Sequence, residues 1–406
     1  MSLEEATALD AADPLAFARD RFHLPDGVIY LDGNSLGALP KDAPARLSEV
    51  VERQWGDDLI TSWNTHGWID WPHHIAAKLA PLVGADPDEL LITDSTSICL
   101  FKLIVSALQA RPGRNVILTE AGNFPTDNYI MQGIAALLPK AELRVVERAD
   151  LTKAIDADTA VLSLTHVDYR GGERLEMAAI DTAAREAGAL SVWDLSHSAG
   201  LIALDLHASG CELAVGCGYK YLNGGPGAPA FLYVASHLQE ELQSPLTGWM
   251  GHADPFAFAG EYRPADGIRK FLTGTPSILA LAALDAGLDT FADIDMALVE
   301  DKAEGLTGFF IESVTELSGI DLSAQSDRPQ RGGHVVVPHE HGYAVMRALI
   351  ERGVIGDFRA PDLIRFGFAP LYNTFKDAWG AAELLADILR SKSWQDPRFA
   401  TREKVT

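Results

Sequence analysis

The chain has 406 residues, of which 47% are hydrophobic and 22% are charged, which is typical of a globular protein with a large buried core. Its 57 acidic and 33 basic residues give a net charge of −24. Because this charge repels phosphate backbones and anionic lipids, neither nucleic acid nor a membrane is an expected partner.

The N-terminal segment, residues 1–50, has few structural signals of its own. Residues 1–20 carry acids where a signal peptide has a basic end and an apolar core, so no export signal is expected. One short strand is predicted around residues 28–31. We expect this segment to pack beside a small C-terminal domain or beside a partner subunit.

Residues 51–276 form the predicted large domain, in which short apolar runs alternate with helical patterns. This alternation is typical of βαβ units around a mainly parallel sheet, so the predicted fold class is α/β. Seven strands are expected, at Leu90–Thr93, Asn115–Thr119, Leu143–Val146, Ala160–Leu164, Leu190–Asp194, Leu213–Cys217 and Ala230–Val234. Amphipathic helices are expected between them, at Ser97–Gln109, Thr126–Leu138 and Met177–Ala187.

Residues 277–406 form a predicted smaller α+β domain. Two helical patterns follow Pro276, at Ser277–Thr290 and at 297–316. Strands are then expected at His334–Val337 and Leu363–Phe368, with helices between and after them.

Two neighbouring strand ends carry a possible catalytic pair. Asp194 and His197 follow one apolar strand, and Lys220 follows the next strand and precedes a glycine-rich turn. Taken singly, Asp194 is explained as a helix cap and Lys220 as a surface lysine. Together they match a pyridoxal phosphate site, where a carboxylate keeps the pyridine nitrogen protonated and a desolvated lysine forms a Schiff base.

Two helix starts offer a cradle for the cofactor. The sequence DSTS at 94–97 places hydroxyls and free backbone N–H groups at a helix N-terminus, which favours an anion such as phosphate. The sequence FPTD at 124–127 presents an aromatic face to a ring at the start of another helix. Each motif alone is equally well explained as a helix cap.

With these residues in place, the chain resembles the kynureninase family of fold-type-I pyridoxal-phosphate enzymes, which are related to class V aminotransferases. The matching segments run in family order over nearly the whole chain: YLDGNSLGALP at 30–40, DSTS at 94–97, FPTD at 124–127, VWDLSHSAG at 192–200, GYKYLNGGPG at 218–227, GWMGH at 248–252 and RFGFAPLYN at 365–373. The first of these segments and the last two are the most diagnostic.

The resemblance implies a role for each residue that matches a cofactor position. Lys220 would bind the cofactor covalently and shuttle the α-proton, Asp194 would pair with the pyridinium, and Tyr219 would contact the phosphate and protonate the β-carbon. Further cofactor contacts are implied for Thr96, Ser97, Phe124, Asp127, Thr165 and His197. Trp249 and Thr275 would reach the cofactor of a neighbouring subunit, which implies a homodimer with shared active sites.

The resemblance also implies substrate contacts. Arg365 would bind the substrate α-carboxylate, a task that suits a planar guanidinium, although a structural ion pair is the alternative. Ser35 matches a substrate-contacting position. Trp63 and His66, within a tryptophan-rich segment that could instead be core packing, would lie near the substrate's aromatic ring. Gly274 would lie beside that ring and favour L-kynurenine over its 3-hydroxy form.

The implied reaction is hydrolytic Cβ–Cγ cleavage of L-kynurenine to anthranilate and L-alanine in tryptophan catabolism. A cysteine desulfurase, a class V aminotransferase and a non-catalytic binding protein are the alternatives. A desulfurase needs a mobile cysteine, whereas Cys99, Cys211 and Cys217 all lie in apolar patterns that predict burial. These cysteines are also too few and too irregular for disulfides or a metal site, and they suit a cytoplasmic protein.

Overall fold

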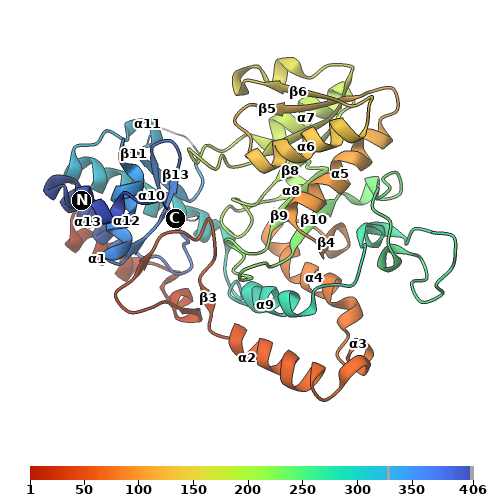
Figure 1. Cartoon of the computed structure of the whole chain (residues 1–406), viewed down its shortest axis with the longest axis horizontal. Coiled ribbons are helices and arrows are strands. Elements are labelled where there is room, and N and C mark those ends of the chain that lie inside the picture. The colour runs from red at the N-terminus through yellow and green to blue at the C-terminus, as the bar shows by residue number, and fades with distance from the viewer. Residues whose placement is uncertain (327–329, 403–406) are drawn as a thin grey trace.

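The computed structural model describes residues 1–326 and 330–402. Its larger body is built on a seven-stranded sheet with the order β4-β10-β9-β8-β7-β5-β6 (Figure 1). The strands are β4 (Leu90–Thr93), β5 (Val116–Glu120), β6 (Glu142–Val146), β7 (Thr159–Thr165), β8 (Leu190–Asp194), β9 (Leu213–Cys217) and β10 (Ala230–Val234). The strands β9, β8, β7, β5 and β6 run parallel, and β10 is antiparallel to both of its neighbours, β4 and β9. The predicted α/β class and mainly parallel sheet are confirmed.

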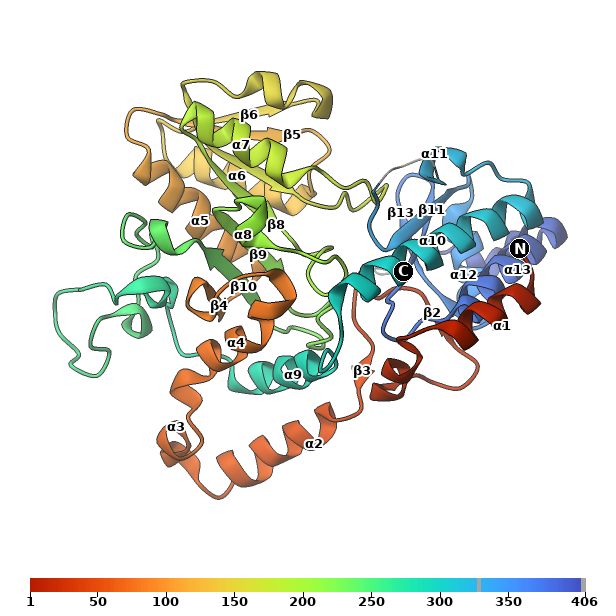
Figure 2. The ribbon, with the colours of Figure 1, turned by 180° about the vertical axis from the view of Figure 1, so that it is seen from behind.

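Helices cover both faces of this sheet, which explains why its central strands are almost continuously apolar. Side chains alternate between the two faces: Val161 packs with α5 and α6, and the next residue, Leu162, packs with α4 and α7. Figures 1 and 2 show these two helical layers from opposite sides. The helices are α4 (Trp71–Val83), α5 (Thr96–Ala110), α6 (Pro125–Leu137) and α7 (Met177–Ala187), with the short α8 (Leu206–Ser209) after β8.

The smaller body has its own apolar core around a three-stranded antiparallel sheet with the order β11-β14-β13. Its strands are β11 (His334–Pro338), β13 (Asp357–Arg359) and β14 (Leu363–Gly367). Its helices are α10 (Met296–Ser318), α11 (Ser323–Ser326), α12 (Gly342–Glu351) and α13 (Phe375–Ser391). The N-terminal helix α1 (Leu3–Ala12) packs against α13, and β2 (Ile29–Tyr30) pairs in parallel with β12 (Val354–Ile355).

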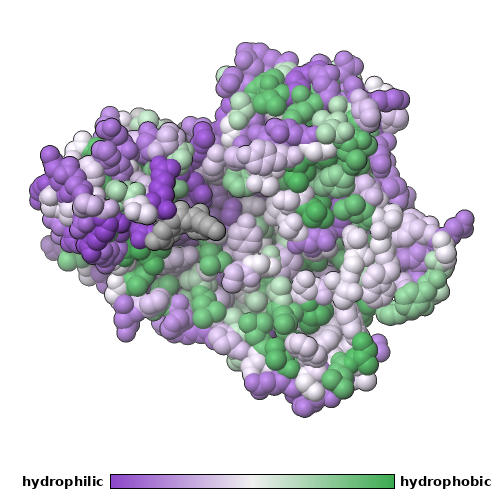
Figure 3. All heavy atoms as spheres, in the orientation of Figure 1, coloured by the Kyte–Doolittle hydropathy of each residue, from purple (hydrophilic) through white to green (hydrophobic). Residues whose placement is uncertain are grey.

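The chain passes from the small body to the large one through a projecting arm. After the paired strands β1 (Phe22–His23) and β3 (Leu39–Pro40), the arm contains α2 (Ala43–Ser48), a π-helical stretch (Glu49–Trp55) and α3 (Ser62–Thr65). Helix α9 (Ile278–Asp289) packs against α2 and α4. The arm exposes Trp55, Leu59 and Ile60, and Figure 3 shows apolar surface in this region.

No helix in the described ranges is both long and apolar enough to cross a membrane. The predicted strand bounds at 190–194, 213–217 and 230–234 match the observed ones. The predicted strand Leu90–Thr93 and the predicted helix Met177–Ala187 match as well. The other predicted strands and helices that were given bounds differ from the observed ones by one or two residues at an end, apart from the N-terminal strand, where only Ile29 and Tyr30 are paired.

Candidate functional site

The carboxyl ends of β8 and β9 bring Asp194 and Lys220 to one edge of the sheet. The two strands are adjacent and parallel, so their ends meet at that edge. Asp194 is the last residue of β8 and only 4% exposed, and its Oδ1 accepts a hydrogen bond from the Ser196 backbone N–H at 2.7 Å. Lys220 is half-buried three residues after β9. This is the pairing that the sequence predicts.

A second buried carboxyl, Asp127 at the start of α6, lies against Asp194. Burial raises the pKa of Asp127 well above its usual value, the neighbouring Asp194 charge raises it further, and Thr165 and Lys220 partly oppose this. Burial and the Asp194 charge therefore both favour the protonated form of Asp127. The Thr165 hydroxyl completes the group, 2.5 Å from the Asn123 amide oxygen and 3.3 Å from Asp127 Oδ2.

The Lys220 ammonium lies between two aromatic rings. Its Nζ is 5.9 Å from the centre of the Phe124 ring and 6.0 Å from that of Tyr219. Phe124 caps α6 and meets Tyr169 edge-on, with ring centres 5.2 Å apart. Burial raises the pKa of Tyr219 well above its usual value, so its hydroxyl stays protonated.

His197 is buried behind these groups as a neutral imidazole. Burial lowers its pKa well below the usual value, and the nearby Lys220 charge lowers it further. Its Nε2 lies 3.2 Å from the Asn34 carbonyl oxygen, so this nitrogen carries the hydrogen. Its Nδ1 is buried and has no hydrogen-bond partner among the described residues. An acceptor nitrogen is thus left beside the Lys220 site.

Ser95, the N-cap of α5, and Tyr219 line a cavity of about 400 Å³, whose lining does not include the predicted contacts Thr96 and Ser97. Thr96 and Ser97 are the first two residues of α5, and both are half-buried. The cavity is also lined by Gly274 and Thr275, which follow a short 3-10 helix in the same chain. Free backbone N–H groups at the start of a fifteen-residue helix attract an anion, and the cavity places Tyr219 near them.

Arg365 lies on β14 and is only 2% exposed. The sequence allowed two roles for it, binding of the substrate carboxylate or a structural ion pair. Its guanidinium forms a two-pronged ion pair with Asp357, including Nε to Oδ1 at 2.8 Å. It also donates to the Tyr169 carbonyl at 2.7 Å and to Ser35 Oγ at 3.1 Å. The structural ion pair is therefore present, and Ser35, the other expected substrate contact, lies beside Arg365.

Sequence reasoning missed Asp357. It stands directly across from Arg365 in the antiparallel β13–β14 pair, and it also accepts from Arg359 Nη2 at 2.6 Å. The signal in the sequence is weak: Asp357 and Arg365 are eight residues apart, on two short strands joined by a three-residue turn, which can place one acid opposite one arginine. Asp32 adds a further acid, and burial beside Asp357 raises its pKa to about 7.

Three predicted contacts lie away from Lys220 within this chain. Trp63 and His66 belong to α3 and its end, at the tip of the arm, where Trp63 packs edge-on against Trp68 at 5.8 Å. His66 Nε2 pairs with Asp58 Oδ2 at 2.7 Å. Trp249 lies beside an exposed loop and meets Phe258 face to face at 6.5 Å. Figures 1 and 2 both show α3 far from the ends of β8 and β9.

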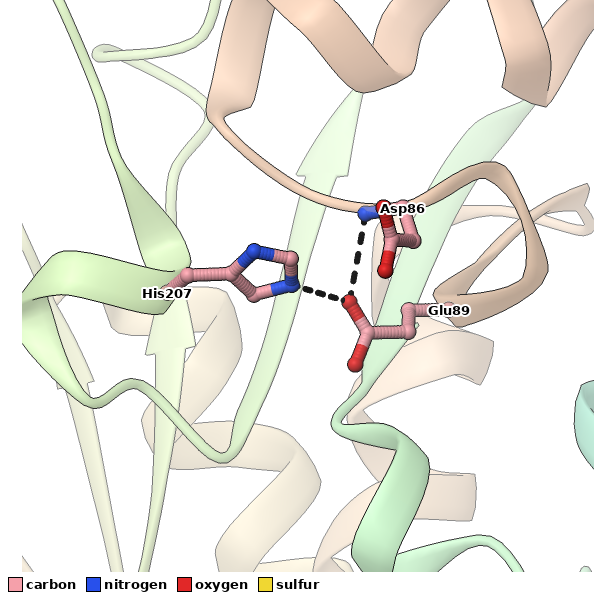
Figure 4. A group of neighbouring side chains, drawn as sticks. All are labelled: Asp86, Glu89 and His207. Atoms are coloured by element: carbon pink, nitrogen blue, oxygen red, sulfur yellow. Dashed lines mark hydrogen bonds and ion pairs between the residues drawn. The ribbon is translucent and has the colours of Figure 1, made fainter.

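One group of possible metal ligands lies elsewhere, at Asp86, Glu89 and His207 (Figure 4). Glu89 is 4% exposed, and its carboxylate accepts from His207 Nε2 at 2.5 Å and from the backbone N–H groups of Asp86 and Ser236. These bonds form a helix cap and a contact with α8, so the group is explained by folding alone.

Comparisons with known proteins decide the family. A kynureninase from Burkholderia mallei is 50% identical over 412 residues, which cover 99% of each chain. A kynureninase from Pseudomonas fluorescens is 47% identical over 411 residues with the same coverage. The family model for the kynureninase C-terminal domain matches residues 299–385. The chain belongs to the kynureninase family. Kynureninases are pyridoxal-phosphate-dependent hydrolases that act on carbon–carbon bonds.

Solved structures share the fold of this kynureninase family member. The apo cysteine desulfurase from Thermococcus onnurineus NA1 aligns over 93% of this chain and 98% of its own, with a TM-score of 0.79 and 20% identity. A variant of the enzyme C-DES with glycine covalently linked to its pyridoxal phosphate aligns over 90% and 98%, with a TM-score of 0.77 and 18% identity. At these identities the likeness shows the shared fold alone.

The residues of this kynureninase family member fit the family's cofactor. Asp194 and Asp127 are two buried carboxyls in contact. A buried carboxylate needs a charged hydrogen-bond donor, and the protonated ring nitrogen of the cofactor would supply one. The unpartnered His197 Nδ1 offers a further acceptor. The cavity beside Tyr219 and α5 has room for a phosphate group.

Proposed function

We propose that this chain hydrolyses L-kynurenine to anthranilate and L-alanine, and 3-hydroxykynurenine more weakly, with pyridoxal 5′-phosphate held by Lys220. The observation that carries the proposal is the placement of Lys220 at the same sheet edge as buried Asp194, between two aromatic rings. Bound there, the cofactor supplies an electron sink for a carbanion at the substrate α-carbon. Its phosphate would be held by Thr96, Ser97 and Tyr219.

Lys220 and Asp194 would divide the work of holding and activating the cofactor. Asp194 would accept the hydrogen of the ring nitrogen, and Asp127, whose pKa is raised by burial and by the Asp194 charge, would donate to Asp194. Phe124 would stack on the cofactor ring, because the centre of the Phe124 ring lies 5.9 Å from Lys220 Nζ, the atom that would bind the cofactor. Once the substrate amine has replaced it, the Lys220 amine takes the proton from the substrate α-carbon.

Tyr219 would complete the reaction as a proton donor. Water attacks the γ-carbonyl, the Cβ–Cγ bond breaks, and anthranilate leaves while the electron pair stays on the alanyl part. The Tyr219 hydroxyl, kept protonated by burial, then donates its proton to the β-carbon. Lys220 returns the α-proton, and L-alanine is released.

Arg365 would bind the α-carboxylate of the substrate. Asp357 accepts from Nε and from one hydrogen of Nη2, so the substrate would use the second Nη2 hydrogen, which now faces Ser35, and Nη1, which now faces the Tyr169 carbonyl. Asp357 thus fixes the plane of the guanidinium, and Ser35 offers a hydroxyl beside it. This arrangement unites the two roles foreseen for Arg365, with the ion pair orienting the clamp.

The remaining contacts support a homodimer with shared active sites. Trp63, His66 and Trp249 lie on the projecting arm and beside an exposed loop, where they can reach the site of a second copy. The exposed apolar residues of the arm, Trp55 and Ile60, are surfaces that such a partner would bury. The three free cysteines suit a cytoplasmic enzyme.

The main alternative is a cysteine desulfurase, because a desulfurase of known structure shares this fold. A desulfurase attacks with an accessible thiolate, whereas Cys99, Cys211 and Cys217 are all buried. Burial raises the pKa of each of these thiols. The sequence expectation that they are buried is confirmed, and no described cysteine can serve as the nucleophile.

The test is to add L-kynurenine to the purified protein with pyridoxal phosphate and no keto acid, and to follow anthranilate fluorescence. Turnover with equal amounts of alanine is expected. Lys220→Ala should lower the rate by on the order of 1000-fold, because both the covalent anchor and the proton shuttle are lost. Anthranilate that appears only with added keto acid would point to an aminotransferase, and retained activity in Lys220→Ala would refute the assignment.

A further inference from the structure

Helix α5 buries a lysine that the mechanism does not use. The Lys102 side chain is 0% exposed, although lysines are almost never fully buried unless they are paired. Its Nζ donates to Asp94 Oδ2 at 2.5 Å and to the Phe271 carbonyl oxygen at 2.5 Å. It thus joins Asp94, the residue that follows β4, to the segment that leads into Gly274 and Thr275.

Asp94 is the only charged residue that lines the cavity at the start of α5. It sits in the left-handed backbone region, with φ at 44°, and the Thr93 hydroxyl donates to its carboxylate at 3.1 Å. Its side chain is 27% exposed. A carboxylate at this position repels a phosphate dianion unless a cation cancels its charge.

We propose that Lys102 is a positioning residue for the cofactor phosphate. Its buried ammonium cancels the charge of Asp94, which lies two residues before Thr96 and lines the cavity that Tyr219 also lines, and its bond to the Phe271 carbonyl holds the ammonium in place. This inference rests on the proposed function, which places the phosphate beside Thr96 and Ser97.

An ion pair that merely stabilises the fold makes a different prediction. Losing it would loosen the whole site, and the affinity for pyridoxal and for pyridoxal phosphate would fall together. Charge cancellation acts on the phosphate alone, so removal of Lys102 should weaken pyridoxal phosphate and spare pyridoxal. The ratio of the two dissociation constants therefore separates the two explanations.

The experiment uses the full chain stripped of cofactor, with both dissociation constants measured from visible absorbance. Lys102→Met should weaken pyridoxal phosphate about tenfold or more and change pyridoxal less than about threefold. The double variant Asp94→Asn/Lys102→Met removes both charges and should recover most of the lost affinity.

A matched control is available in Lys302, which is also buried and donates to an aspartate, Asp13, at 2.7 Å and to the Pro370 carbonyl at 2.6 Å. It lies on α10 in the small body, away from the cavity. Lys302→Met should leave the ratio of the two dissociation constants unchanged.

The inference is wrong if Lys102→Met keeps the wild-type ratio, or if the double variant stays as weak as the single one. If Lys102→Met does not fold, Asp94→Asn is tested alone. This variant should bind pyridoxal phosphate at least as tightly as the wild type, and weaker binding would refute the inference. If the wild type itself does not prefer pyridoxal phosphate over pyridoxal, the proposed phosphate site fails instead.

Discussion

The two ends of the candidate site are built differently. At the cofactor end, Asp194, Asp127 and His197 are at most 4% exposed, and each is fixed by strands or helices of one chain. At the ring end, Trp63 and His66 stand on a projecting arm, and Gly274 is exposed. The cofactor end is preorganised within a single chain, whereas the ring end would be completed by a second copy. The chemistry thus depends on the fold of one chain, and in the proposed homodimer substrate choice would depend on assembly.

The largest expected effect on kcat lies at the cofactor end, where the two acids Asp194 and Asp127 are compared. Asp194→Asn removes the charge that holds the ring nitrogen protonated, and we expect kcat to fall on the order of 1000-fold. Asp127→Asn should cost less than about tenfold, because burial and Asp194 raise the pKa of Asp127 so that it already acts as a neutral donor. Steady-state anthranilate assays check both, and equal losses would show that Asp127 works as a carboxylate.

An effect of intermediate size on kcat/KM tests the proposed binding of the substrate carboxylate by Arg365. Arg365→Lys loses the planar fork, and kcat/KM should drop about 100-fold, mainly through KM. Asp357→Asn keeps the arginine but frees its plane, so KM should rise by about tenfold with kcat little changed. Binding of L-alanine, which has the carboxylate without the ring, should weaken in parallel. A change confined to kcat in Asp357→Asn would contradict the orienting role.

The smallest effect is expected at the ring end. A Cβ added at Gly274 meets nothing within 4 Å in the chain, so Gly274→Ser should change the free energy of unfolding by less than about 0.5 kcal/mol. It should alter the preference between kynurenine and 3-hydroxykynurenine by up to about tenfold. Gly367→Ala is the contrast, because its Cβ would overlap the Asn34 side chain and destabilise the fold. An unchanged preference would remove Gly274 from the ring site.

The sequence predicted strand bounds best where burial of both sheet faces makes the strand continuously apolar. The strands ending at Asp194 and Cys217 are continuous apolar runs with both faces covered, so their bounds and the pair that follows them could be read locally. The Asp357 partner of Arg365 was missed because a contact across two strands leaves only a weak signal in one sequence. Lys102 was missed because a single lysine in an apolar helix is usually explained by a stem that reaches solvent.

The most direct test of the central claim is to find which lysine carries the cofactor. The holoenzyme is reduced with borohydride, digested, and mapped by mass spectrometry, with Lys102 as the internal comparison because it is buried nearby. The account predicts that the visible absorbance is bleached and that the cofactor is fixed on Lys220 alone. A label on another lysine, or a colourless protein with no label, would contradict it.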